Sequence, residues 1–257
     1  RGGAGHVGAV THFEFIAHPV GDVHFGTLTF KFDNRKEIVT GWRDYMRIAP
    51  EELTTTCMVM PAFMGGEPTV MVLCCYNGTD QEKANAALAP LRELPELISD
   101  DIAIKPYTDI LEEGYPPEEG TKVVARSLFM CSFSDEAIDI IVSNPNRPYM
   151  IRSLGGAMSR VSPDATAFAH RDSEVMLILP AFARADATEE EIAAALEPWS
   201  KLKNLGEGSY MGFSSVTADE EVHRVFPPAT YAKLAAIKQK YDPNNIFSQN
   251  YNVSLSR

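Results

Sequence analysis

The sequence predicts an α+β protein in which an antiparallel sheet carries helices on one face. Two observations predict this class. Short segments with alternating apolar and polar residues recur along the chain, and segments with helical periodicity separate them. Their order is strand–strand–helix–strand–strand–helix, followed by a looser second copy. With 45% hydrophobic and 23% charged residues among 257, the chain has the composition of an ordinary globular protein.

The expected elements follow the chain in order. Residues 10–17 alternate enough for a half-buried strand, and residues 24–32 alternate again. Asn34 is a suitable N-cap for a helix to about residue 48. Residues 53–63 and 69–76 are expected to pair as strands around a turn. The same criteria predict strands at 101–105, 123–133, 149–153 and 175–182, an exposed loop at 112–120, and helices at 80–94, 134–142, 188–203 and 228–240.

The net charge of −12 argues against nucleic acid or an anionic membrane as a partner. No window approaches the roughly 18–20 uninterrupted apolar residues of a membrane span. No signal peptide is visible either, although the natural start of the chain is not in view, since position 1 is not Met. The expected location is cytoplasmic, and the charge argues for no particular substrate.

The sulfur-containing residues are expected to lie in the interior. The cysteines form no CxxC pair and no zinc-like cluster with the histidines, so no metal site is expected. Free buried thiols in a reducing compartment are the preferred interpretation. A methionine-rich patch is expected to fill core, with an adaptable apolar pocket as the alternative. The residues concerned are Cys57, Cys74, Cys75, Cys131, Met58, Met60, Met64 and Met71.

The C-terminal end combines a helix stop, a turn and two spaced amides. Asp242-Pro243 ends a helix, because proline disfavours helix in the residue before it. Asn250 and Asn252 are two residues apart, so on an extended segment both amides point the same way. Such a pair could hydrogen-bond the edge of a polar heterocycle. The alternative is a tail held by ordinary hydrogen bonds.

The N-terminal end contains a literal GxGxxG at Gly3, Gly5 and Gly8. A dinucleotide fingerprint of this kind follows a strand and opens a helix. Here a strand-like segment follows the glycines, so a Rossmann fold is rejected. The remaining interpretations are a glycine-rich turn whose backbone lies against a ligand, and a plain tight turn before a strand.

Four stretches, in this order, resemble FAD-linked oxidases of the vanillyl-alcohol-oxidase superfamily, in particular berberine-bridge-enzyme-like members. The matches are RGGAGHVGAVTHFEF with His18-Pro19-Val20-Gly21, GGAM with AFAHR, the helix YAKL to Tyr241, and YDPNNIF with NYNV. Each motif is moderately specific, but together they extend over nearly the whole chain. The resemblance implies that residues 1–20 and 206–257 belong to a flavin-binding domain and that residues 21–205 form a substrate-binding α+β domain.

The resemblance also implies an activity larger than this chain. A complete enzyme of this kind transfers a hydride from an organic substrate to FAD, with O₂ as the electron acceptor. The N-terminal half that holds most of the FAD is not in the sequence, so we expect a cropped chain that is inactive alone and binds FAD weakly or not at all. Apolar surfaces around residues 10–15 and 246–247 would then be exposed, and a homodimer through them is expected.

Individual residues carry over from the resemblance. The expected cofactor-side residues are Gly5, His6, Gly8, Asn250 and Asn252, and the expected substrate-side catalytic residues are Tyr107, His170 and Tyr210. His6 departs from the family, which usually has Asn there. The alternative for the AFAHR segment is a structural His170, with Arg171 paired to Asp172 or Glu174.

A rival interpretation is a non-catalytic or degenerate binding module that keeps the oxidase scaffold. Phe213 stands where plant-type members have a tyrosine base, and the strand around Leu177 has an apolar residue where they have a glutamate. Together with His6, these differences favour the rival. A third interpretation is an unrelated α+β protein that matches by chance.

Overall fold

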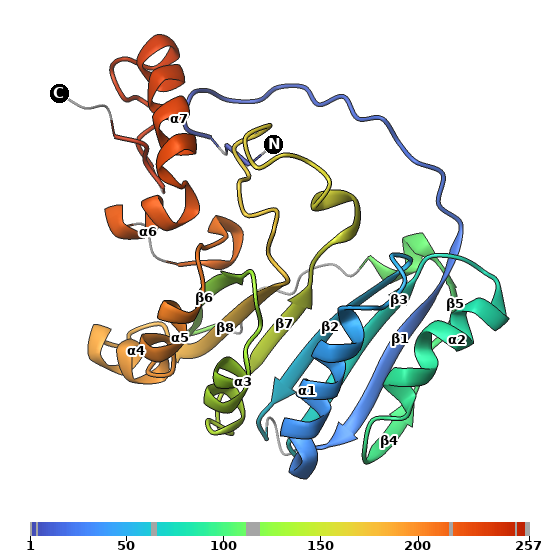
Figure 1. Cartoon of the computed structure of the whole chain (residues 1–257). Helices are drawn as coiled ribbons and strands as arrows, with labels where there is room; N and C mark the ends of the chain where they lie inside the picture. The colour runs from blue at the N-terminus through green and yellow to red at the C-terminus, as the bar shows by residue number, and fades with distance from the viewer. Residues whose placement is uncertain are drawn as a thin grey trace.

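The computed structural model describes residues 2–3, 5–62, 66–111, 119–215, 218–249 and 251–254. These residues form an eight-stranded antiparallel sheet in the order β4-β1-β3-β2-β7-β8-β6, with β5 also paired to β1 (Figure 1). The strands are β1 Asp22–Lys31, β2 Leu53–Met60, β3 Thr69–Tyr76, β4 Leu97–Asp100, β5 Ala103–Pro106, β6 Thr121–Met130, β7 Tyr149–Ser153 and β8 Val175–Arg184. The predicted antiparallel sheet is confirmed.

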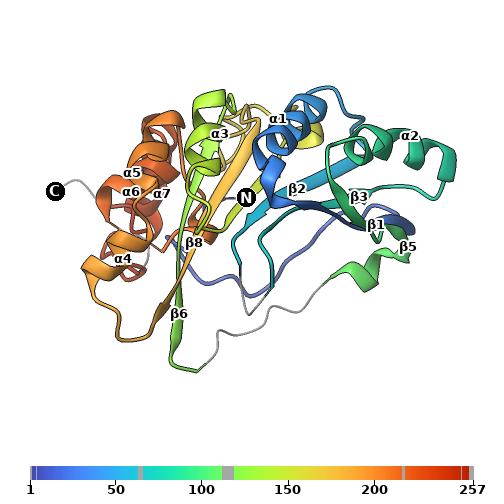
Figure 2. The ribbon, with the colours of Figure 1, turned by 90° about the horizontal axis from the view of Figure 1, so that it is seen from below.

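Helices cover one face of this sheet, as predicted (Figure 2). The helices are α1 Arg35–Met46, α2 Gln81–Arg92, α3 Asp135–Val142, α4 Glu189–Ala195, α5 Trp199–Leu202, α6 Asp219–Val225 and α7 Pro228–Tyr241. The main core lies between sheet and helices, where Phe30, Trp42 and Leu128 are fully buried. A separate, smaller core joins α6, α7 and the C-terminal segment around Val222, Phe226 and Val253.

Local capping determines where several helices begin. Asp80 accepts hydrogen bonds from the backbone of α2, and Ser134 does the same for α3. Thr188 and Glu191 form the predicted capping box at the start of α4. The expected helix 188–203 is wrong in its second half, because Pro198 cannot continue a helix and the chain restarts as α5. Asn34 precedes α1 as predicted but makes no side-chain capping bond.

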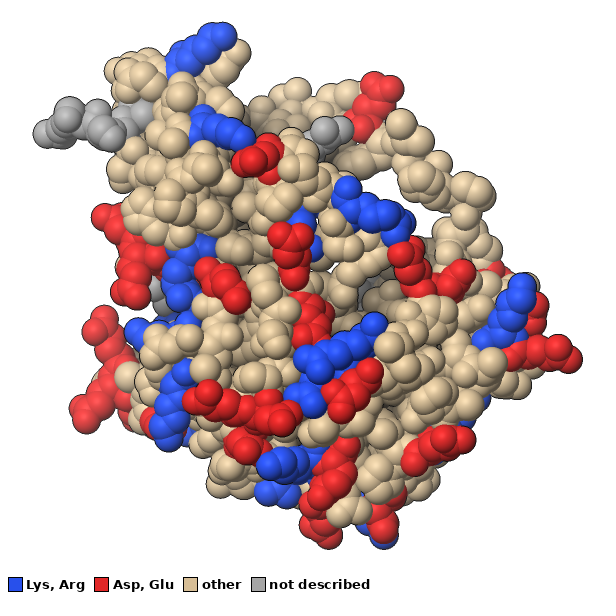
Figure 3. Space-filling model, viewed as in Figure 1, with Lys and Arg blue, Asp and Glu red and all other residues tan. Residues whose placement is uncertain are grey.

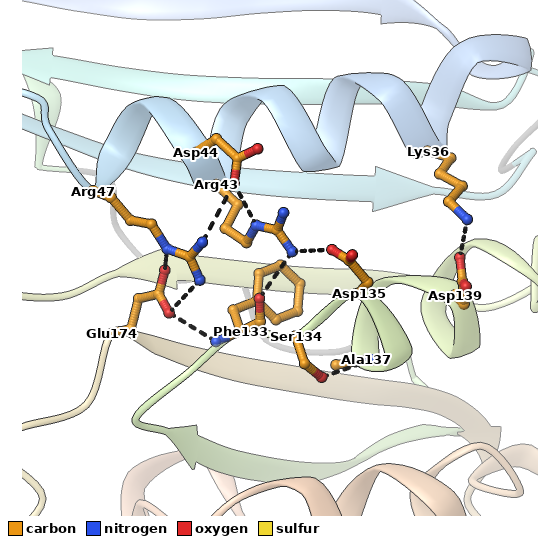
Figure 4. A network of polar contacts seen from close by, with 10 residues as sticks. All are labelled: Lys36, Arg43, Asp44, Arg47, Phe133, Ser134, Asp135, Ala137, Asp139 and Glu174. Carbon is orange, nitrogen blue, oxygen red and sulfur yellow. Dashed lines mark hydrogen bonds and ion pairs between the residues drawn. The ribbon is translucent and has the colours of Figure 1, made fainter.

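Polar side chains join α1 to α3 and to the loop before β8 (Figure 4). Arg43 is buried and donates to the carboxylate of Asp135 and to the carbonyl of Phe133. Arg47 binds Glu174 through two nitrogens, at 2.6 and 3.1 Å. Glu174 in turn accepts from the backbone N–H of Phe133. These bonds hold the helix layer in register over the sheet.

The predicted strand at residues 10–17 is wrong. In the structure this segment is extended and exposed, and it arches from the N-terminal turn to β1 (Figure 1). Phe15 is 81% and Ile16 is 90% exposed. Alternation shows that a segment has two faces, but a strand also needs a partner. Within the described ranges, no strand pairs with this segment.

The sheet face away from the helices carries a band of methionines. Met58 is directly opposite Met71 on β3 and Met150 on β7. All three are half-buried, and their sequence neighbours point into the helix-covered core instead. The expectation that Met58, Met60 and Met71 fill core is therefore wrong, since half-buried Met60 is also on this face. Met64 and most of the loop 112–120 lie outside the described residues.

The cysteines are free, as expected, but not all are buried. Burial raises the pKa of Cys74 to about 12, so its thiol is neutral and inert. Cys131 is exposed, which corrects the prediction of an interior thiol. It follows the last residue of β6, where the chain leaves the sheet.

No helix in the described ranges is long and apolar enough to cross a membrane.

A buried hydrogen bond between α1 and β2 provides a test of this packing. Trp42 Nε1 donates to Thr55 Oγ1 at 2.8 Å inside the core. Thr55→Val keeps the shape and the β-branch but leaves the indole N–H without an acceptor. We expect a loss of about 1–3 kcal/mol in the free energy of unfolding by urea titration. Thr54→Val, on the exposed neighbouring residue, should have little effect, and an equal loss in both variants would contradict the assignment.

Candidate functional site

Two cavities lie beside the methionine-bearing face of the sheet. The larger, about 690 Å³, is lined mainly by apolar groups that include Phe129, Leu154 and Met176. The smaller, about 480 Å³, lies against the glycine-rich turn. Gly2, Phe168 and Tyr210 line both cavities, so the two are neighbours. Sizes and linings of this kind suit small organic molecules.

The glycines of the N-terminal turn serve two different purposes. Gly2 has φ +88°, and a Cβ there would lie 2.5 Å from the backbone nitrogen of Phe168. Its lack of a side chain is therefore required by the fold. Gly5 and Gly8 line the smaller cavity, and a Cβ on either would meet nothing within 4 Å. Packing within the described chain does not explain why these two positions are glycine.

Lys238 of α7 fastens the N-terminal turn to the C-terminal segment. Its side chain is fully buried, and Nζ donates to the carbonyl of His6 at 2.8 Å, to Asp242 Oδ2 at 2.9 Å and to the carbonyl of Phe247 at 2.9 Å. Asp242 also accepts from the backbone N–H groups of Ile246 and Phe247. We call Lys238, Asp242 and the two carbonyls the α7 clamp. Burial alone would raise the pKa of Asp242, but the bonds from Lys238 and the backbone outweigh it and hold that pKa below its ordinary value.

His6 is oriented into the chain. Its ring contacts Phe226 edge-on, with 5.4 Å between ring centroids, and its Nε2 is buried without a partner among the described residues. Burial, followed by the nearby charge of Lys238, lowers the pKa of His6, which favours a neutral imidazole. The backbone of His6 therefore belongs to the glycine-rich turn beside the smaller cavity. Its side chain packs against Phe226 of the smaller core.

His170 is a hydrogen-bonded, packed histidine at the wall of the smaller cavity. Its ring stacks on Phe129 at 4.9 Å, and its Nε2 lies 3.0 Å from the carbonyl of Arg224 and 3.2 Å from that of Val225. Two carbonyls around Nε2 require the tautomer that carries its proton there. Burial lowers the pKa of His170, so the neutral form is favoured. This arrangement matches the structural alternative considered for this residue.

The lowered pKa of His170 gives a pH prediction. Because the unfolded histidine titrates near 6.5, the unfolded chain binds more protons than the folded chain below that pH. The contribution of neutral His170 to the free energy of unfolding is therefore fully present above about pH 6.5 and decreases as the pH falls below that value. His170→Gln keeps an N–H donor without a titrating ring. We expect urea midpoints of this variant to fall less between about pH 7.5 and 5.5 than those of the wild type or of His12→Gln, an exposed control.

Of the three substrate-side candidates, only Tyr210 lines both cavities. Its side chain is 37% exposed and lines both cavities, and its ring lies 5.7 Å from that of Phe213. Its backbone is fixed by the buried hydroxyl of Ser127, which lies 2.9 Å from both the nitrogen and the carbonyl oxygen of Tyr210. A phenol held in this way can exchange hydrogen bonds with a molecule in either cavity.

Tyr107 is not brought together with His170 and Tyr210. It follows β5, which pairs with β1 at the far side of the sheet. Three inter-strand steps separate β1 from β7, which corresponds to about 14 Å. Tyr107 is 38% exposed and lines neither cavity. Sequence alone did not show this separation, because it depends on strand order.

Two asparagines of the C-terminal segment have buried side-chain oxygens without partners among the described residues. Asn250 lies outside the described residues. Asn252 is half-buried, and its Oδ1 is a buried acceptor without a partner in the part of the chain that the structure describes. Asn245 Oδ1 is in the same state. Acceptors of this kind are costly unless a further group satisfies them.

Arg171 pairs with neither Asp172 nor Glu174, which corrects the alternative considered from the sequence. Its terminal nitrogens donate to the carbonyl of Met158 at 3.2 Å and to Thr166 Oγ1 at 2.8 Å. Glu174 is engaged by Arg47 instead. Leu177, noted for its apolar character, is fully buried in the main core, whereas its neighbour Met176 lines the larger cavity.

The sequence of this chain is similar to those of known proteins. Residues 209–254 match the family model described as "Berberine and berberine like". Over 266 residues the chain is 27% identical to an FAD-linked oxidoreductase of Dictyostelium discoideum, covering 98% of this chain and 56% of that relative. It is 30% identical over 202 residues to (R)-6-hydroxynicotine oxidase of Paenarthrobacter nicotinovorans, covering 72% of this chain and 44% of that relative.

Solved structures show the same fold. 6-Hydroxy-D-nicotine oxidase from Arthrobacter nicotinovorans superposes with a TM-score of 0.73 at 18% identity, covering 91% of this chain and 55% of that one. A carbohydrate oxidase from Microdochium nivale gives 0.74 at 19% identity, covering 93% and 56%. The chain thus spans about half the length of the proteins it matches.

The fold defines the class of protein: an α+β module with two neighbouring cavities beside the uncovered face of an antiparallel sheet. Sequence and fold together identify the chain as corresponding to the C-terminal part of FAD-linked oxidases of the berberine-bridge-enzyme-like kind. The recognition drawn from the sequence motifs is confirmed, and the cofactor named for the curated relatives is FAD, as predicted.

Proposed function

We propose that residues 1–257 provide the substrate-binding part of an FAD-dependent oxidase that removes a hydride from a small organic molecule. Residues 21–205 would form the substrate-binding domain, and residues 1–20 and 206–257 would belong to the flavin-binding domain. The observation that carries the proposal is the pair of neighbouring cavities with a shared wall at Tyr210, one against a glycine-rich turn and one against the sheet. The smaller core around Phe226, which is separate from the main core, supports a domain boundary after residue 205.

The residues around the smaller cavity fit a flavin. Gly5 and Gly8 leave open space beside the backbone that the chain itself does not use. Asn245 and Asn252 of the C-terminal segment do not line this cavity, but their buried side-chain oxygens lack partners among the described residues and suit the N–H donors of a heterocycle. The α7 clamp ties the glycine-rich turn, which lines the cavity, to the C-terminal segment.

FAD, when bound, supplies the hydride acceptor, and O₂ takes up the electrons. The residues of this chain bind and orient the substrate. Phe129, Leu154 and Met176 give an apolar wall that excludes water, and the methionine band continues it. Tyr210 has an exposed phenol at the junction of the two cavities, where it can hold the proton that a substrate O–H or N–H releases. His170 positions Phe129 and the cavity wall.

The test uses the full-length protein that the gene encodes. It should retain FAD, visible as flavin absorbance after gel filtration. Gly8→Ala should weaken FAD binding about tenfold, because a Cβ would intrude on the ligand side. Its melting temperature without FAD should not change, since the added Cβ meets nothing in the chain. Gly21→Ala is the matched control: its Cβ also meets nothing, and Gly21 lines neither cavity.

The outcomes separate the rival interpretations. A full-length protein that never takes up FAD would refute the oxidase and favour the non-catalytic module. FAD uptake that Gly8→Ala leaves unchanged would keep the oxidase and reject the glycine turn as part of the site. The exposed apolar residues of the arch and of the C-terminal turn, such as Phe13 and Ile246, support the expectation that residues 1–257 alone form a homodimer. Analytical ultracentrifugation checks that expectation.

A further inference from the structure

Arg152 has an unusual position on the uncovered face of the sheet. It is on β7, directly opposite Thr56 on β2 and Met176 on β8. Its guanidinium lies 4.8 Å from the ring centroid of Phe213. Its Nε is buried without a hydrogen-bond partner, and no ion pair or hydrogen bond joins its side chain to any described residue. The guanidinium therefore has no counter-charge among the described residues, and only its Nε is shut off from solvent.

A half-buried arginine without a counter-charge keeps its terminal nitrogens available for an anion. A cation over an aromatic ring recovers part of the lost hydration but satisfies none of the five guanidinium donors. Several other arginines have a carboxylate partner, such as Arg47 with Glu174 and Arg92 with Asp100, while Arg35 and Arg126 bind backbone carbonyls. On the face seen in Figure 3, acidic and basic side chains are interspersed. With a net charge of −12 the protein has carboxylates in excess, and yet none of the described ones reaches Arg152.

The neighbouring cavity shows the same imbalance. Arg152 is not among the residues that line the larger cavity, but its neighbours are: Met176, opposite it on β8, and Leu154, which directly follows the end of β7. Arg171 lines it too, and Arg171 has only a carbonyl and a hydroxyl as acceptors, with its Nε unpartnered. No Asp or Glu is among the described residues that line this cavity. The lining of the larger cavity is therefore mainly apolar, and its one charged residue among those described is Arg171.

We propose that the substrate is an organic anion, an apolar or aromatic molecule with a carboxylate, and that Arg152 is the residue that selects it. The inference rests on the proposed function and specifies its substrate class. Phe213 holds the guanidinium plane from one side, and the donors are free for a carboxylate, which Arg binds in bidentate fashion. The apolar body of the ligand lies against Met176 and Leu154.

The experiment measures binding of matched acids and amides to the full-length protein by titration calorimetry, which needs no flavin signal. The probes are benzoate and 3-phenylpropionate, with benzamide and 3-phenylpropanamide as their neutral counterparts. We expect each acid to bind at least tenfold more tightly than its amide. Arg152→Met, which keeps the chain length and the contact with Phe213, should remove this preference, and Arg152→Lys should keep part of it. Arg160→Met, on an exposed arginine outside the larger cavity, is the control.

Stability and flavin content discriminate between the roles of Arg152. Because Arg152 has no hydrogen-bond or ion-pair partner among the described residues, Arg152→Met should leave the melting temperature unchanged or raise it. A marked fall would assign Arg152 a structural role and overturn the proposal. Loss of FAD in Arg152→Met with acid binding intact would mean that the cofactor supplies the anion, which also overturns it. Acids that bind no better than amides, or do not bind, have the same consequence. A protein without FAD that still prefers the acids would refute the oxidase and keep the anion site.

Discussion

Lys238→Met is expected to lower the free energy of unfolding by roughly 3–5 kcal/mol, the usual result of removing one partner from a buried ion pair. The methylene stem would still pack in α7. However, the carboxylate of Asp242 would stay buried without its cation, and the carbonyls of His6 and Phe247 would lose their donor. Urea unfolding of residues 1–257 measures the loss.

Lys240→Met provides the control, because Lys240 is two residues away on the same helix and exposed. Hydrogen exchange gives a second, more local readout: amides of residues 5–8 should lose protection in Lys238→Met and not in Lys240→Met. Because the pKa of Asp242 is lowered, the stability that this carboxylate contributes is present above the ordinary aspartate pKa near 3.8 and is lost as the pH falls below it. Similar losses in both variants would show that the clamp is not the cause.

Gly208→Ala is expected to cost about 3 kcal/mol, at the upper end for an overpacked interior site. An alanine Cβ would overlap the imidazole of His170, which cannot move aside because Phe129 stacks on it and two carbonyls bind its Nε2. Gly208 also accepts the backbone hydrogen bond of Phe129, so the strain reaches β6.

Gly5→Ala is the matched control for this substitution, since a Cβ at Gly5 meets no atom within 4 Å. Thermal and urea unfolding of the two variants should therefore differ by nearly the whole effect. If Gly208→Ala unfolds like the wild type, His170 is free to move and its part in fixing the cavity wall is refuted.

Local rules predicted most of the sheet and the helices. The alternation in β1, β2, β3, β7 and β8 and the caps at Asp80, Ser134 and Thr188 are properties of a few neighbouring residues, and the sequence shows them directly. Pro198 is likewise a local signal, and it marks the break between α4 and α5. The short helix α6 and strand β4 were not expected, because neither has strong periodicity.

The site was harder to predict because long-range pairing assembles it. The acceptors of His170 lie 54 and 55 residues further along the chain, and the clamp joins Lys238 to a carbonyl 232 residues away. Lys238 stands among other lysines, so its burial has no signature in the sequence. Tyr107 and Tyr210 looked equivalent until the strand order separated them. Arg152 has one signal in the sequence, a charge within a short, otherwise largely apolar strand, but this signal does not say what the charge binds.

The α7 clamp has a mechanical consequence. It joins residue 6 to residues 242 and 247, so the sheet and its helices form a closed loop of chain whose two ends are held together. Tension applied between the N- and C-terminal segments would be borne by Lys238 and its acceptors, and the strands would carry no load until those bonds failed. In a single-molecule pulling experiment, the wild type should therefore give a first rupture of short extension, followed by unfolding of the sheet. Lys238→Met should lack that first event.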